Sequence, residues 1–137
     1  MGMMRIGISL ALVLGAGAAQ AAECEDNFRT DGNFFSGRRY TTSQTFEAAP
    51  EAVFRRAYAA LTQEGWVIRS SDRDMLAISA ATEVSFGDGK SAPLNVLVEP
   101  TATGSRVSMT FTISGGLVAS NPRGNMCELM AKFAPSA

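Results

Sequence analysis

The side chains that could carry out chemistry are few and widely spaced in this sequence. None of the 137 residues is a histidine, which excludes a Ser-His-Asp triad, a Cys-His pair and an imidazole metal ligand. Neither a GxGxxG pattern nor a P-loop occurs, so no nucleotide phosphate site of these kinds is indicated. The sequence therefore predicts no catalytic residue, no cofactor and no metal site, and it favours a protein that is not an enzyme.

Carboxylates are the remaining acid–base candidates. Asp72 and Asp74 flank Arg73, but the further acidic positions of a calcium loop are absent and aspartate is common in turns. We therefore interpret this run as a turn. A glycosidase-like pair stays open among four glutamates whose spacing in the fold the sequence does not give: Glu47, Glu51, Glu83 and Glu99.

The first residues have the pattern of a secretory signal peptide. Arg5 provides a short positive region, residues 6–18 are uncharged and mostly apolar, and residues 19–21 (Ala-Gln-Ala) form a small-x-small cleavage site. The apolar run is shorter than the roughly 20 residues that a membrane span needs. We expect residues 1–21 to be removed and the mature chain to begin at Ala22. This predicts a periplasmic or secreted protein with no transmembrane span in the mature chain.

The two cysteines are Cys24 and Cys127, one near each end of the mature chain. Export to an oxidising compartment makes a disulfide the favoured state of an isolated pair. A reactive or metal-binding thiol pair is the alternative, which the absence of a CxxC spacing and of histidine disfavours. Glu23 precedes Cys24, whereas a lipoprotein signal requires a small residue there, so we expect soluble export.

The composition of the mature chain bounds its size and partners. Without residues 1–21, which include Arg5, 116 residues remain with eleven basic and thirteen acidic side chains, a net charge of −2. This length suits one domain, and we expect residues 22–137 to form it, with a core from about 39 to 133. The charge argues against nucleic acid as a partner.

The methionines allow one further metal hypothesis. Met109, Met126 and Met130 could bind copper(I), because thioethers are soft ligands. Methionine is also a routine filler of hydrophobic cores, and Met126 and Met130 share an apolar face with Leu129 and Phe133. We favour a core role for all three methionines.

One amphipathic helix is the strongest structural signal. Pro50 suits a first helical position, and Val53, Ala57 and Leu61 recur on one face at intervals of four residues. Gly65 is the expected left-handed stop before Trp66. The sequence therefore predicts a helix that begins at Pro50 and ends before Gly65.

The rest of the chain has strand periodicity. Alternating apolar residues predict strands within 40–46, 66–70, 76–86, 94–98 and 107–113, with a hairpin turn at 87–90, and a short last helix is expected after Pro122. We predict an α+β, two-layer domain. Its mostly antiparallel sheet would have four to five strands, with one long helix packed on one face and a short C-terminal helix.

The run from Thr45 to Phe54, with Ala57, Leu61, residues 65–68 and Asp72, resembles the opening of the BamC-like helix-grip-type periplasmic domains. This resemblance spans about residues 46–114 and is a pattern of apolar and turn residues. It implies a non-enzymatic module that acts through protein contacts in a Gram-negative envelope.

Two functions follow as hypotheses. The first is a protein-binding or structural module of the cell envelope, whose partner is another envelope protein. Its contact patch would comprise Phe34, Phe35, Arg38 and Arg39, although for the aromatic residues the sequence favours the alternative that they cover one end of the core. The second is a carrier of a small apolar ligand or lipid, with a pocket between helix and sheet that holds about 300 Å³ or more. That pocket would be lined by Phe54, Tyr58, Trp66, Leu76, Met109 and Phe111.

Overall fold

A computed structural model describes residues 22–83 and 91–135. The expected signal peptide at 1–21 and the expected hairpin turn at 87–90 lie outside the described residues.

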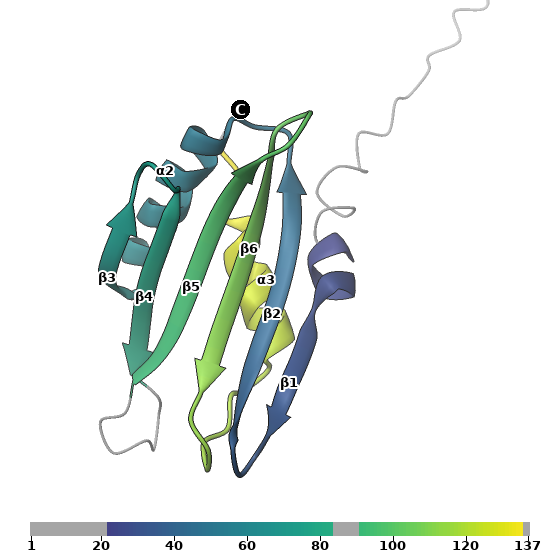
Figure 1. Cartoon of the computed structure of the whole chain (residues 1–137), viewed down its shortest axis with the longest axis vertical. Helices are drawn as coiled ribbons and strands as arrows, with labels where there is room; N and C mark the ends of the chain where they lie inside the picture. Colours follow the sequence, from purple (N-terminus) through teal and green to yellow (C-terminus); the bar gives the residue numbers. More distant parts are fainter. Residues whose placement is uncertain (1–21, 84–90, 136–137) are drawn as a thin grey trace, which may run out of the picture.

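Six antiparallel strands form one sheet in the order β1-β2-β6-β5-β4-β3 (Figure 1). The sheet holds together because each strand pairs with a neighbour through backbone hydrogen bonds, leaving β1 and β3 as edges. The strands are β1 (Arg29–Asn33), β2 (Gly37–Phe46), β3 (Val67–Asp72), β4 (Ala77–Glu83), β5 (Ser91–Pro100) and β6 (Ser105–Ile113).

Helices cover one face of this sheet. The helix α2 (Pro50–Gln63) contacts β3, β4, β5 and β6, and α3 (Pro122–Ala131) contacts β2. Both lie behind the sheet in Figure 1. Residues 22–27 are also helical, and they lie beside the part of β2 that β1 does not reach, where the Thr45 amide donates to Glu23 Oε1 at 3.0 Å. Neither α2, α3 nor residues 22–27 has the length and hydropathy that a bilayer crossing needs.

The prediction for α2 is confirmed at both ends and on its buried face. Pro50 is the first helical residue, and Val53, Ala57 and Leu61 are fully buried against the sheet. Gly65 has a φ of +88°. Its amide donates to the Thr62 carbonyl while the next amide donates to the Leu61 carbonyl, the pair of bonds that ends a helix in a Schellman motif.

The prediction of four to five strands with one long helix on one face is wrong. The sheet has six strands, and α2 is 14 residues long and shares the covered face with α3. The strand missed was β1, whose five residues are all exposed. An edge strand with both faces in solvent has no apolar alternation to reveal it, and Asp31, Gly32 and Asn33 have the composition of a turn. The actual turn follows at residues 34–36.

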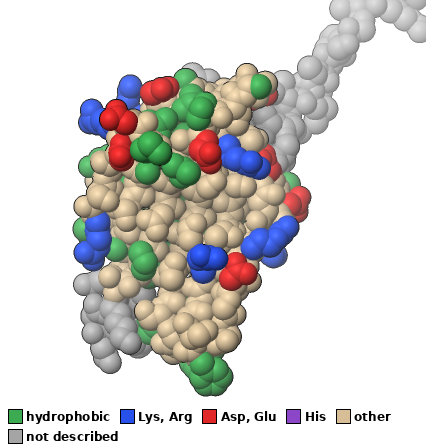
Figure 2. All heavy atoms as spheres, in the orientation of Figure 1, with side chains coloured by type: hydrophobic (Ala, Val, Ile, Leu, Met, Phe, Trp, Pro, Cys, Tyr) green, Lys and Arg blue, Asp and Glu red, His purple; other side chains and the backbone are tan. Residues whose placement is uncertain are grey.

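The inner face of the sheet and the helices form one core, which runs from Cys24 to Phe133. The centre of the opposite face carries mostly small hydroxyl and amide side chains, and neither α2 nor α3 covers it. Figure 2 shows this face as a broad area without hydrophobic or charged side chains at its centre, with charged residues around its margins. A shallow hollow of about 540 Å³ lies there, lined by residues that include Ser79, Asn95, Ser108 and Thr110.

Candidate functional site

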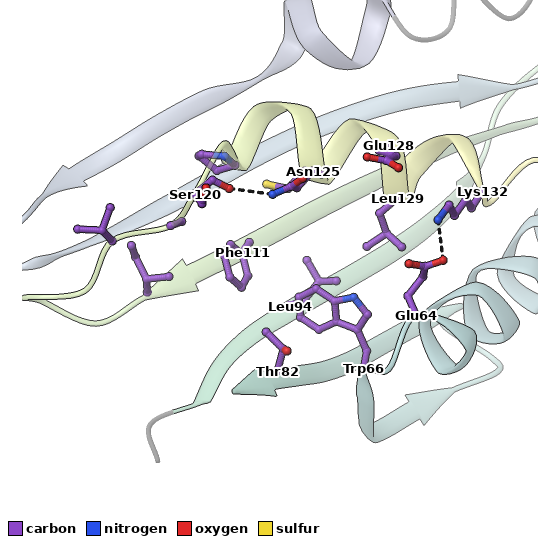
Figure 3. Close-up of a pocket in the computed structure, with 15 residues that line it drawn as sticks. Glu64, Trp66, Thr82, Leu94, Phe111, Ser120, Asn125, Glu128, Leu129 and Lys132 are labelled. Carbon is purple, nitrogen blue, oxygen red and sulfur yellow. Dashed lines mark hydrogen bonds and ion pairs between the residues drawn. The ribbon is translucent and has the colours of Figure 1, made fainter. Parts of the chain in front are cut away.

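A cleft of about 450 Å³ lies between α3 and the inner face of the sheet (Figure 3). Its mostly apolar floor comes from β4, β5 and β6 and from Trp66, which directly precedes β3; its roof is α3, and the loop between β6 and α3 closes one end. The lining residues are Glu64, Trp66, Thr82, Leu94, Phe111, Ile113, Val118, Ala119, Ser120, Pro122, Asn125, Met126, Glu128, Leu129 and Lys132.

The floor is positioned by strand register and by the end of α2. Phe111 of β6 lies opposite Leu94 of β5 and opposite Tyr40 of β2. Trp66 follows Gly65 directly, so the Schellman turn that ends α2 sets where the indole enters the cleft. Trp66 and Phe111 meet edge to face with ring centroids 5.9 Å apart, a favoured geometry for aromatic pairs. The floor is therefore a fixed aromatic surface.

The roof is positioned by the start of α3 and by a disulfide. Asn121 adopts a left-handed conformation with a φ of 45°, and its side chain accepts a hydrogen bond from the Gly124 amide, which caps the helix. The Asn125 amide group donates to the Ser120 carbonyl at 2.8 Å. Cys24 and Cys127 are bonded, so the predicted disulfide is confirmed. It ties α3 to the N-terminal helical residues, between two residues that line the cleft, Met126 and Glu128.

The rim at the far end of α3 is charged. Lys132 Nζ donates to Glu64 Oε1 at 2.6 Å, which links α3 to the end of α2. This hydrogen bond from Lys132, with the added charge of Glu128, raises the pKa of Lys132 above its ordinary 10.5. Both side chains of the pair are about 40% exposed (39% and 42%). With two carboxylates around one ammonium, the rim has an excess of negative charge.

This arrangement has the features of a cleft that could bind a small molecule. Apolar side chains, among them Leu94, Phe111 and Leu129, lie in the middle of the cleft in Figure 3, while polar groups lie along α3, at the rim and, in Thr82, on the floor. Sites for small molecules commonly combine an apolar lining with few polar groups that fix orientation. Within residues 22–83 and 91–135, no three acidic or cysteine side chains come close enough to hold a metal ion.

Only two of the six residues predicted to line a pocket do so. Trp66 and Phe111 line the cleft. Phe54 and Met109 are buried in the core, Tyr58 is 42% exposed on α2, and Leu76 lies in the turn between β3 and β4. The cleft lies under α3 and not under α2, because the small and branched residues of α2 pack closely against the sheet.

Most of the cleft residues that sequence reasoning missed come from α3 and its loop, and the others are Glu64, Thr82, Leu94 and Ile113. Leu129 and Met126 belong to the predicted apolar face of the last helix, but the apolar face of a short helix predicts packing against a core and gives no sign of a cleft. The residues 114–120 that separate β6 from α3 contain a glycine pair. This pair was the one signal that the helix does not follow the strand directly.

The predicted contact patch is grouped in one hairpin. Phe34 and Phe35 form the turn between β1 and β2 and are 40% and 89% exposed. Arg38 and Arg39 begin β2 and point to opposite faces of the sheet. The aromatic pair therefore does not cover the core.

In the predicted turn the side chain of Asp72 bonds to the backbone. Asp72 ends β3, and its carboxylate accepts hydrogen bonds from the amides of Asp74 and Met75 at 2.9 and 3.0 Å. This is the local bonding that makes aspartate frequent in turns. The turn prediction is confirmed.

The chain matches no protein-family model and no curated protein. Several solved structures have a partial likeness to it, among them the following two. One is a conserved protein of unknown function, EF2215, from Enterococcus faecalis, which is 9% identical with a TM-score of 0.49 and covers 85% of this chain and 78% of its own. The other is protein CV1439 from Chromobacterium violaceum, which is 16% identical with a TM-score of 0.32 and covers 69% of this chain and 91% of its own. Likeness at this level carries no functional inference, and the resemblance to BamC-like domains stays a prediction.

Proposed function

We propose that this chain is an exported binding protein whose cleft under α3 holds a small apolar ligand. The observation that carries the proposal is the cleft itself: about 450 Å³, with an aromatic floor of Trp66 and Phe111 and an aliphatic wall that includes Leu94 and Leu129. This volume falls within the roughly 300–1,000 Å³ of small-molecule sites. Of the two functions that the sequence suggested, the cleft supports the carrier of an apolar ligand.

The charges at the rim narrow the class of ligand. Lys132 is already hydrogen-bonded to Glu64, so an anionic end group would have to displace a carboxylate. Glu128 has no ion pair within the described residues and contributes the excess negative charge. The rim therefore favours a ligand with an uncharged or cationic end over a fatty acid.

Export is part of the proposal. The pattern of residues 1–21 predicts a signal peptide, and the disulfide between Cys24 and Cys127 is of a kind that persists in oxidising compartments. Together they support a periplasmic or secreted location.

The single tryptophan of the chain provides a direct test, because Trp66 lines the cleft. We expect the neutral probe N-phenyl-1-naphthylamine to change Trp66 emission on binding. Ala119→Phe, which places a ring in the cleft, should weaken that binding at least tenfold. Ala131→Phe makes the same change on the exposed side of α3 and should leave binding unaltered.

Two results would refute a binding role for the cleft. One is a wild-type protein whose fluorescence does not respond to the probe at any soluble concentration. The other is equal affinity in the Ala119→Phe and Ala131→Phe variants, which would place the probe elsewhere. Competition with dodecylamine and with dodecanoate then tests the charge preference of the rim. Dodecylamine should displace the probe at the lower concentration.

A further inference from the structure

We propose that the turn between β1 and β2 inserts into the surface of an anionic membrane, with Phe34 and Phe35 as its apolar tip. This inference concerns a different surface from the cleft and does not depend on ligand binding there. In Figure 2 a hydrophobic group projects at the lower end of the molecule, where Figure 1 places this turn.

The tip is exposed and yet held in shape. Phe35 is 89% exposed, which is unusual for a large aromatic side chain that serves only stability. Its ring meets that of Phe34 edge to face at 5.5 Å. Asn33 Oδ1 accepts hydrogen bonds from the amides of Phe35 and Ser36, both at 2.9 Å.

The neighbouring loop braces the same turn. The Gly116 amide donates to the Phe34 carbonyl at 2.7 Å, and Gly115 lies so close to the Phe35 carbonyl that a Cβ atom there would clash with the backbone. Both aromatic side chains are thus presented by a turn that is fixed on two sides. Because the turn is already ordered, its insertion into a membrane would cost little conformational entropy.

Basic residues lie at the depth that membrane headgroups would occupy. Residues 34–36 form the turn and Gly37 begins β2, so Arg38 lies one residue rise, about 3.4 Å, further along the strand than Gly37, and apolar faces of interfacial segments insert by about 5–10 Å. Arg39 has one counter-ion in the described structure, Asp31 at 4.0 Å, and both side chains are more than 60% exposed (61% and 64%). Such a pair is weak, so Arg39 stays available to lipid phosphate.

The size and shape of the tip favour a membrane over a protein partner. Two aromatic side chains offer at most about 150–250 Å² each, well below the roughly 800 Å² that each partner contributes to a standard protein interface. A protruding apolar point backed by two guanidinium groups needs no complementary protein surface. Anionic lipid satisfies both the apolar and the basic component.

The test is vesicle flotation with the disulfide-bonded protein lacking residues 1–21, which precede every element of the described fold. We expect binding to vesicles of phosphatidylcholine with 30% phosphatidylglycerol, weaker binding to phosphatidylcholine alone, and loss of binding as sodium chloride is raised. Phe35→Ser should reduce partitioning at least tenfold, because burying a phenylalanine side chain is worth at least one tenfold step. Because Phe35 is exposed to water, we expect the Phe35→Ser variant to fold as the wild type does, and an unchanged urea midpoint would verify this.

Matched variants separate the tip from general hydrophobic or basic character. Met75→Ser removes another large exposed apolar side chain, 65% exposed, from the turn between β3 and β4 and should leave partitioning unchanged. Arg38→Gln/Arg39→Gln should weaken binding to anionic vesicles, whereas the same change at Arg55 and Arg56 of α2 should not. Equal partitioning of wild type and Phe35→Ser would overturn the proposal. So would Phe35-dependent dimerisation in analytical ultracentrifugation without vesicle binding, which would make the tip a protein interface.

Discussion

Trp66 owes its place in the cleft to the residue before it. Gly65 takes a left-handed conformation that other residues adopt at a cost, and this reverses the chain at the end of α2. The amide of Trp66 then bonds back to Leu61, so a buried residue of the helix and an aromatic residue of the cleft are joined by one backbone hydrogen bond. This hydrogen bond therefore contributes both to the end of α2 and to the placement of a residue that lines the cleft.

Leu61 is the residue at which the packing of α2 is most directly tested. It is fully buried, and we expect Leu61→Ala to lower the free energy of unfolding by about 2–5 kcal/mol, through lost burial and the cavity that remains. Urea unfolding followed by circular dichroism measures this. Gln63→Ala, an exposed change in the same helix, should alter stability by no more than about 0.5 kcal/mol. A midpoint shift of that small size in Leu61→Ala would show that α2 does not pack on this face.

Lys132 makes a prediction about pH at the rim of the cleft. Because the hydrogen bond to Glu64 raises the folded-state pKa of Lys132, the pair stabilises the fold below the ordinary value of 10.5, and this contribution disappears as the pH rises through the folded-state pKa. We expect the pKa of Lys132, measured by NMR of its ε-methylene group, to fall toward 10.5 in Glu64→Gln. Glu51→Gln, on the opposite end of α2, should leave it unaltered, and an equal pKa in both variants would contradict the pairing.

At the scale of elements, the disulfide decides how firmly α3 covers the cleft. It closes a sequence separation of 103 residues, for which chain entropy predicts a stabilisation of about 4–5 kcal/mol. We expect Cys24→Ala/Cys127→Ala to lose a large part of this in urea unfolding. The probe affinity of the cleft should fall as well, because Met126 and Leu129 lie on the helix that is released. The wild-type protein treated with reductant should behave as the double variant does; unchanged stability in both would show that α3 is held by packing alone.

The elements that could be predicted from sequence are those with one buried face and one exposed face. The helix α2 has a proline at its start, a glycine after its end and a buried stripe between them, and all three signals act locally. By contrast, β1 is exposed on both faces and exists because β2 offers it a partner. A strand stabilised by pairing alone leaves no hydrophobic pattern to detect.

The cleft could not be predicted because it belongs to no single element. Trp66, Leu94 and Leu129 come from three parts of the chain, and the space between them depends on where the loop after β6 places α3. Each of these residue types, taken alone, is typical of a hydrophobic core. The pairing of Cys24 with Cys127, on the other hand, needed only the count of cysteines and an export signal, which is why it could be predicted.

At the scale of the molecule, the two proposed surfaces share one loop. The residues that follow β6 bond to the aromatic turn through Gly116 and then line the cleft through Val118 and Ala119. The aromatic turn and the end of the cleft that this loop closes therefore lie at neighbouring ends of the same connection. A carrier that receives an apolar ligand at a membrane would need these two surfaces close together.

The proposed export concerns the whole chain, and it makes a prediction about the state of the disulfide. We expect the protein produced with residues 1–21 in a Gram-negative host to reach the periplasm with an intact mass that begins at Ala22 and with no thiol free for alkylation, because the oxidising compartment forms the bond between Cys24 and Cys127. The same chain without residues 1–21 should stay in the cytoplasm with both thiols reduced and unfold at a lower urea concentration. Oxidation of that purified chain should raise its urea midpoint to that of the periplasmic protein, since both then carry the same disulfide. A periplasmic protein that keeps Met1, or one that carries two free thiols, would contradict the export signal in the first case and the oxidising destination in the second.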